Sequence, residues 1–138
     1  MSDVTVTPSA VLAATSNTGV ARGTAGAAIT AGQVVWADPA ASYEIKPAQA
    51  TNQTQALNVV GIALNGAALG QPIAYATSGD VTFNSAFTVT GVYVLSAANP
   101  GGIAPHTDLA TGNWATFLGI ATSTTNLRLG IIASNAQK

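Results

Sequence analysis

The sequence predicts an all-β fold, a small barrel or sandwich built from two pseudo-repeated β units with an extended N-terminal arm. Three observations carry this prediction. Short apolar runs of strand length recur along the chain, clusters of Gly, Pro, Asn or Ser separate them, and four blocks of the first half reappear in the second. Because either half alone leaves an apolar face and open edges exposed, we expect the two units to close on each other.

The expected strands follow two patterns. Residues 4–7, 81–83 and 87–90 alternate apolar and polar side chains, which is typical of a half-buried strand. Further strands are expected in the apolar runs 33–36, 59–64, 73–76, 92–95, 114–121 and 127–133. Residues 9–14 and 48–57 are candidates for short helices, although neither has an amphipathic stripe. The first is alternatively an ordered arm, and the second a polar loop.

The internal repeat has a period near 58 residues. Residues 32–36, 45–47, 60–63 and 73–76 match 91–95, 103–105, 118–121 and 131–134, at offsets of 59, 58, 58 and 58. A Gly inside a strand commonly marks a bulge or sharp bend, so Gly61 and Gly119 are expected to form the same bend in each half. These matches define a β domain over 29–138, with pseudo-repeats at about 29–80 and 87–138.

Residues 1–28 lie outside the repeat. They are rich in Thr, Ser, Ala and Gly, with Gly19, Gly23 and Gly26 close together, which predicts an extended arm followed by a flexible joint. The arm carries Val4 and Val6 in alternation. It either adds a strand to the sheet edge of a neighbouring protein or forms the first strand of its own sheet.

The composition limits the partners of the chain. Only nine of 138 residues are charged and the formal net charge is −1. Nucleic acid and anionic membrane surfaces require clustered basic residues, and the four present are widely spaced: Arg22, Lys46, Arg128 and Lys138. An almost uncharged surface is poorly soluble, so we expect other copies or partners to cover much of it. The absence of a membrane-length apolar run and of a basic N-terminus predicts neither membrane insertion nor secretion.

No catalytic, cofactor or metal site is predicted. The chain has no Cys, its acids Asp38, Asp80 and Asp108 stand in turns where Asp commonly caps backbone amides, and no spacing resembles a set of metal ligands. His106 and Asp108 are the one possible acid–base pair. However, the chain lacks a Gly-x-Ser-x-Gly nucleophile motif, so a solvated loop His is expected.

The aromatic residues offer an alternative. A carbohydrate-binding module stacks several rings on sugars along one groove, and five rings are available: Trp36, Tyr43, Tyr75, Tyr93 and Trp114. Against this, Trp36 and Tyr93 fall within matched strand blocks of the repeat, where a large ring normally fills a core or a subunit interface.

A series of turn-and-strand phrases resembles small structural proteins of tailed bacteriophages, the capsid decoration or cement proteins. The phrases are Gly61-Ile62-Ala63, Gly70-Gln71-Pro72-Ile73, the break at 77–80, Thr90-Gly91-Val92-Tyr93-Val94-Leu95-Ser96, Gly102-Ile103-Ala104-Pro105, Asp108-Leu109-Ala110-Thr111-Gly112 and Leu118-Gly119-Ile120-Ala121. The likeness covers roughly residues 29–134.

The resemblance implies a structural virion protein without enzymatic activity. Such a subunit is made in the host cytoplasm, is typically a homotrimer, and sits outside an icosahedral head, where it bridges neighbouring major capsid proteins. Within this hypothesis, Val4, Thr5, Val6 and the segment through Val11 are the expected capsid contacts. Trp36, Tyr93 and Trp114 are expected in core or subunit packing. The alternatives are another virion component, such as a head-fibre or tail subunit, a carbohydrate-binding module on the particle surface, and an unrecognised hydrolase that uses His106.

Overall fold

The computed structural model confirms the predicted all-β class, and it describes residues 3–13, 17–84, 87 and 91–138. The first half contains η1 (Pro8–Ala10), β1 (Leu12–Ala13), β2 (Gly19–Thr24), β3 (Val34–Asp38), η2 (Pro39–Ala41), β4 (Glu44–Pro47), α1 (Gln53–Leu57), β5 (Val59–Ala63) and β6 (Pro72–Thr82). The second contains β7 (Val92–Leu95), β8 (Ile103–Pro105), η3 (His106–Asp108), β9 (Trp114–Ala121) and β10 (Asn126–Gln137). The expected strand at 87–90 lies mostly outside the described residues.

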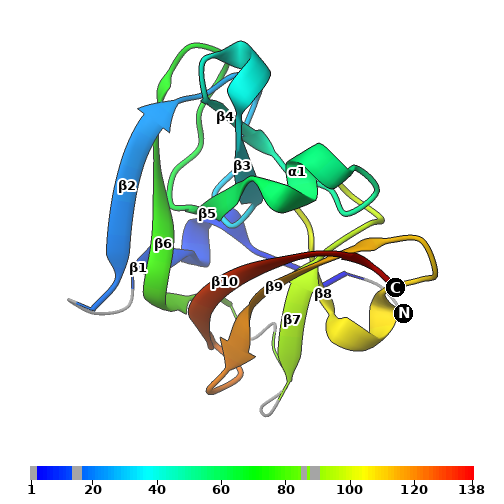
Figure 1. Cartoon of the computed structure of the whole chain (residues 1–138). Coiled ribbons are helices and arrows are strands. Elements are labelled where there is room, and N and C mark those ends of the chain that lie inside the picture. Colours follow the sequence, from blue (N-terminus) through cyan, green and yellow to red (C-terminus); the bar gives the residue numbers. More distant parts are fainter. Residues whose placement is uncertain (1–2, 14–16, 85–86, 88–90) are drawn as a thin grey trace.

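The strands form one curled antiparallel sheet, a half-barrel, in the order β4-β3-β5-β6-β10-β9-β7-β8 (Figure 1). Counted outward from the central β6–β10 pair, both halves have the same strand order. β1 and β2 pair with β6 outside this path. Backbone hydrogen bonds from Ala50 to Ser96 and from Trp114 to Ala50 join the ends of the curled sheet.

The strand pairings recur at a constant offset. Val35 pairs with Gly61 and Pro47 in the first half, and Tyr93 pairs with Gly119 and Pro105 in the second. Every paired residue on β3, β4 and β5 therefore has a counterpart 58 residues later. This corrects the first predicted block, whose offset of 59 aligned Trp36 with Leu95, because the pairing makes Val94 the counterpart of Trp36.

The fourth predicted block is also out of register. Ala63 pairs with Tyr75, whereas its counterpart Ala121 pairs with Leu127, so β6 and β10 are related by an offset of 52 rather than 58. The turn joining β5 to β6 is longer than the turn joining β9 to β10, which accounts for the difference. Residues 131–134 are therefore not the structural counterparts of 73–76.

Gly61 and Gly119 occupy equivalent bulges, as predicted. The pairing shifts by one residue between Val35 and Trp36 opposite Gly61, and between Tyr93 and Val94 opposite Gly119. At each Gly the backbone of the next strand comes so close that a Cβ would meet a carbonyl oxygen, that of Ala76 or that of Arg128. The bulges increase the local twist and help to curl the sheet.

Residues 19–24 correct the expectation of a flexible joint. They form β2, which pairs with β6 along its whole length, and the next residue, Ala25, is fully buried. The three glycines were taken as a sign of flexibility, but small residues are needed here. A Cβ at Gly23 would lie 3.0 Å from Ile45 Cγ1, and one at Gly26 would lie 2.8 Å from Glu44 Cβ.

The apolar side chains form two cores. The main core lies between the halves and includes Trp36, Ile62, Phe83, Leu118 and Leu127. The second core lies on the other side of the first-half sheet, where Ala25, Ile29 and Ala67 cover the side chains of Val35, Ile45, Ala63, Ile73 and Tyr75. Both faces of the first half are therefore buried within the chain.

Short helical segments occur where helices were considered. Instead of a helix over 9–14, η1 spans Pro8–Ala10, and α1 occupies only the last part of 48–57. The side chain of Asn52 caps α1 by accepting a hydrogen bond from Gln55 N at 3.1 Å. Thr116 Oγ1 donates to Ala56 O at 2.7 Å, which fastens α1 to β9.

Candidate interaction surfaces

The N-terminal segment lies against its own domain. Val4 N donates to Ile103 O at 2.8 Å, so the segment follows the edge of β8. Val11 is 3% exposed and belongs to the main core, and the partly buried Val4 and Val6 pack against that core. Thr5 is exposed. Of the four residues predicted to contact a capsid, Thr5 is thus the most accessible, whereas Val11 has a structural role.

Polar contacts fix this segment at two points. Asp3 Oδ1 accepts from Ser96 Oγ at 2.6 Å, and Asp3 Oδ2 accepts from Asn99 Nδ2 at 3.0 Å. Further along, Thr7 N donates to Asn84 Oδ1 at 2.8 Å, and Asn84 Nδ2 donates to Thr5 O at 2.9 Å. Because both hydrogen bonds involve the backbone of the segment, they leave the Thr5 side chain facing outward.

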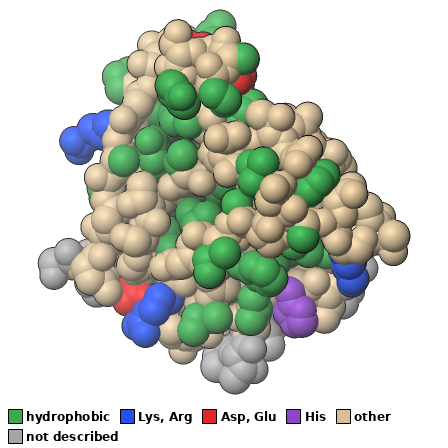
Figure 2. Space-filling model, viewed as in Figure 1, with side chains coloured by type: hydrophobic (Ala, Val, Ile, Leu, Met, Phe, Trp, Pro, Cys, Tyr) green, Lys and Arg blue, Asp and Glu red, His purple; other side chains and the backbone are tan. Residues whose placement is uncertain are grey.

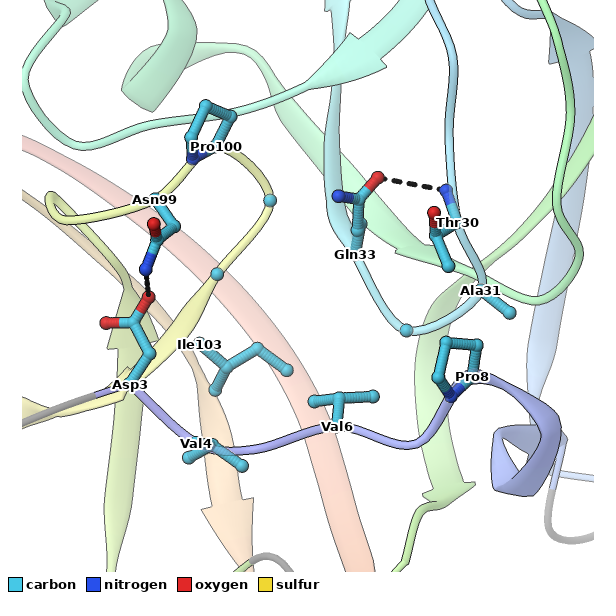
Figure 3. A pocket seen from close by; sticks show the side chains of 13 residues that line it. Asp3, Val4, Val6, Pro8, Thr30, Ala31, Gln33, Asn99, Pro100 and Ile103 are labelled. Atoms are coloured by element: carbon cyan, nitrogen blue, oxygen red, sulfur yellow. Dashed lines mark hydrogen bonds between the residues drawn. The ribbon is translucent and has the colours of Figure 1, made fainter.

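A cavity of about 290 Å³ lies between the N-terminal segment and the loops at 30–33 and 99–103 (Figure 3). Val4, Val6 and Ile103 supply its apolar side. Gln33 lines the other side, where its Oε1 accepts from Thr30 N at 3.0 Å. Asp3 is the one charged residue among those that line the cavity. The recess therefore suits a mostly neutral partner surface and not an anionic ligand.

We expect Val11→Ala to lower the free energy of unfolding by about 2 kcal/mol, because it removes two buried methyl groups and leaves a void in the core. The matched variant Thr5→Ala is expected to change stability by less than about 0.5 kcal/mol, as is usual for an exposed site. Urea denaturation followed by circular dichroism measures both. Equal stability of the Val11→Ala variant and the wild type would show that the segment does not pack as described.

The predicted aromatic residues do not form a row on the surface. Trp36 is buried and its Nε1 donates to Pro47 O at 3.1 Å. Tyr93 is also buried, with its ring centroid 4.9 Å from that of Phe87, and Trp114 is partly buried against the main core. Tyr75 lies in the second core, which leaves Tyr43 as the exposed ring of the five. A single exposed ring is a poor platform for stacking on a sugar chain.

The titratable residues are dispersed. His106 is exposed, and no hydrogen bond joins it to Asp108 in the part of the chain that the structure describes. Among residues 3–13, 17–84, 87 and 91–138, no three His, Asp or Glu side chains gather closely enough to hold a metal ion. Over the same ranges, no helix is both long and apolar enough to cross a membrane.

One charged cluster joins the two halves. Asp80 on β6 is buried, and its Oδ1 accepts from Arg128 Nε at 3.0 Å and from Asn126 Nδ2 at 3.1 Å, both on β10. Asn17 Nδ2 donates to Asp80 Oδ2 at 3.4 Å. The hydrogen bond from Arg128, followed by that from Asn126, lowers the pKa of Asp80, although burial opposes the shift. The carboxylate is therefore held ionised at the centre of the sheet.

A second ion pair lies within the first half. Lys46 Nζ is 2.8 Å from Asp38 Oδ2, and this hydrogen bond is the largest of the causes that lower the pKa of Asp38. Asp38 also caps η2 by accepting from Ala40 N at 3.0 Å. This confirms the turn-capping role that the sequence predicts for Asp38.

The second half leaves one apolar sheet face uncovered. We define the outer face as Val92 on β7, Phe117 and Ile120 on β9, and Ile132 on β10. Phe117, Ile120 and Ile132 are 39%, 49% and 63% exposed. Val92 pairs with Ile120 and Phe117 pairs with Ile132, and directly paired residues share a face. Figure 2 shows hydrophobic side chains gathered over β9 and β10 on this side of the molecule.

The outer face is a site that sequence reasoning missed. The runs 114–121 and 127–133 predict strands correctly, but a continuous apolar run does not show which of its two faces is buried. A partial signal was available in the repeat, since Ile120 is aligned with Ile62 in the third matched block. The alignment alone did not show that only one of the two is covered.

Comparison with known proteins finds no relative: no protein-family model matches the chain, and no curated protein matches it. The structure itself defines the class, which is an all-β protein with a curled antiparallel sheet. Its candidate sites are the surface around the N-terminal segment and the outer face.

Proposed function

We propose that this chain is a non-enzymatic structural protein of a tailed-phage virion that binds the outside of the icosahedral head. The observation that carries the proposal is the outer face, three large exposed apolar side chains on a chain with only nine charges. Contiguous exposed apolar surface typically marks a protein-binding site. The phage class comes from the turn-and-strand phrases described above, and the virion exterior is the location that follows from it.

In this role the protein acts through binding free energy. A protein that binds the assembled lattice, and not its separated subunits, stabilises the lattice. By bridging neighbouring major capsid proteins, it resists the pressure of the packaged DNA. Self-association adds to this effect, because several linked contacts bind far more tightly than one. A surface almost without charge suits contacts based on shape and apolar burial.

The surface around the N-terminal segment is the proposed contact with the capsid. Thr5 is exposed there, Val4 and Val6 are partly buried beside it, and the 290 Å³ cavity provides a recess next to them. In this arrangement Val11 supports the contact from the core and does not touch the capsid directly. The segment thus presents its surface in a fixed shape, which reduces the entropy lost on binding.

Co-sedimentation with phage heads tests the proposal. Heads of the phage that encodes the chain, prepared without this protein, are expected to bind the purified wild type. We expect Thr5→Lys to weaken this binding at least about tenfold, or about 1.4 kcal/mol, because it places a charge in an apolar contact. Thr51→Lys, at another exposed Thr, serves as the matched control.

Two results would contradict the proposal. Failure of the folded wild type to bind the heads would exclude head binding. Binding of glycans in place of heads would favour the carbohydrate-binding alternative. Density for the chain on the head exterior in an electron-microscopy map of the virion would support the proposal directly.

A further inference from the structure

The outer face has a counterpart in the first half that is buried. By the pairing of β3 with β5 and of β7 with β9, Val34, Val59 and Ile62 correspond to Val92, Phe117 and Ile120. Val34 and Ile62 are fully buried in the main core, and Val59 packs against it. The same face of the same structural unit is therefore covered in one half and open in the other.

What covers the first-half face is a sheet face of this same chain. Val34 and Ile62 share the main core with Tyr93, Ala121 and Leu127 of the second half. An antiparallel sheet with a solvated face normally carries polar residues there. The outer face instead retains Val92, Phe117, Ile120 and Ile132, so its composition is that of a face built to be covered by protein.

A second copy is unable to cover the outer face in the way the first half is covered. That arrangement requires a free counterpart of the face formed by Tyr93, Ala121 and Leu127. In the first half, the corresponding residues are Val35, Ala63 and Tyr75, which are buried in the second core. Both faces of this kind are therefore occupied within each chain, and head-to-tail packing of copies through them is blocked.

We propose that two copies of this chain pair through their outer faces about a twofold axis. A self-complementary contact of this kind closes after two subunits, because each copy uses its outer face once. The proposal specifies the self-association that forms part of the proposed function, but it does not depend on binding to a phage head. It also differs from the trimer that the resemblance implies.

The charges near the outer face permit this pairing. Arg128 lies opposite Ile120 in the β9–β10 register and is the cation closest to the face by strand position. Its guanidinium is already paired with Asp80, with Nε 3.0 Å from Oδ1. The formal net charge of −1 per chain adds little repulsion between copies. Burial of the apolar side chains is therefore not opposed by an unpaired charge.

Sedimentation of the full chain over a wide range of protein concentration tests the pairing. We expect the wild type to form a dimer, and Ile120→Lys to raise the dissociation constant at least about tenfold because it buries a charge in the contact. The matched control is Leu69→Lys, at a residue that is 71% exposed in the turn between β5 and β6. It should leave the dimer intact, and circular dichroism confirms that both variants fold.

Cysteine crosslinking provides an independent test, because the chain contains no Cys. A twofold axis brings equivalent residues of the two copies close together, so mild oxidation should crosslink at least one of Phe117→Cys, Ile120→Cys and Ile132→Cys into a covalent dimer. Leu69→Cys should crosslink much more slowly. These variants form a disulfide only if the two thiols approach closely.

Three outcomes would overturn the pairing: a wild type that remains monomeric, a trimer, or an oligomer that Ile120→Lys leaves unchanged. Head binding is measured separately. A dimer that fails to bind heads would leave this inference intact and contradict the proposed function. A monomer that binds heads through the outer face would have the opposite meaning.

Discussion

We expect Gly119→Ala to lower the free energy of unfolding by about 3 kcal/mol, the upper part of the range for overpacking a core. A Cβ at this position would meet the carbonyl oxygen of Arg128 and would lie 2.8 Å from its carbonyl carbon and 3.1 Å from Leu129 Cα. All three are backbone atoms of β10, the strand paired with β9. A side chain can change rotamer to relieve a clash, but here the two central strands of the second half must separate.

Gly61→Ala is expected to have an effect of the same size, because Gly61 occupies the equivalent bulge. Its Cβ would meet the carbonyl oxygen of Ala76 and would lie 2.9 Å from the carbonyl carbon. The matched control is Gly130→Ala on β10, where a Cβ has no neighbour within 4 Å. Urea denaturation measures all three variants. A loss no greater than that of the control would show that the bulges tolerate a side chain and are not close backbone approaches.

The paired glycines illustrate what the sequence predicts well. A Gly within an apolar run is a local signal, and its recurrence 58 residues later identifies the same bend twice. The strand positions are predictable for the same reason, since apolar runs and their flanking turn residues are local features. The all-β class and the position of most strands follow from these signals alone.

Register between distant strands is less predictable, because side chains alternate with a period of two residues. The fourth block was displaced from an offset of 52 to one of 58, an even shift that keeps the apolar residues in phase. Its error is therefore invisible in the pattern. The first block was displaced by one residue, and there the shared Gly of Gly32 and Gly91 fixed the alignment in place of the strand itself.

The candidate surfaces depend on tertiary contacts and could be predicted only in part. Alternation of Val4 and Val6 indicates an extended segment, but not that Val11 enters the core or that Asp3 binds Ser96 and Asn99. The outer face depends on which side of β9 is covered. That is decided by how the sheet curls, and no local pattern records it.

Replacement of Asp80 tests how the two halves are joined, and we expect Asp80→Asn to lower the free energy of unfolding at pH 7 by about 2 kcal/mol. The carboxylate accepts from Asn17, Asn126 and Arg128, so it links the segment before β2 to both central strands. An Asn at this position carries no charge and offers one acceptor oxygen in place of two. Thermal or urea unfolding measures the loss, and Asp38→Asn, whose ion pair joins strands within one half, is expected to lose less.

The loss should also depend on pH, with a sign that the lowered pKa of Asp80 fixes. Because the pKa is lower in the folded protein than the value of about 3.9 in the unfolded chain, the ionised carboxylate stabilises the fold above that value. This stabilisation disappears as the pH falls through the folded pKa. The stability curves of wild type and Asp80→Asn should therefore converge below about pH 4, while the contribution of Asp38 cancels because both proteins contain it. A difference that stayed constant from neutral to acidic pH would mean that the cluster acts through packing, and that its charge does not hold β6 to β10.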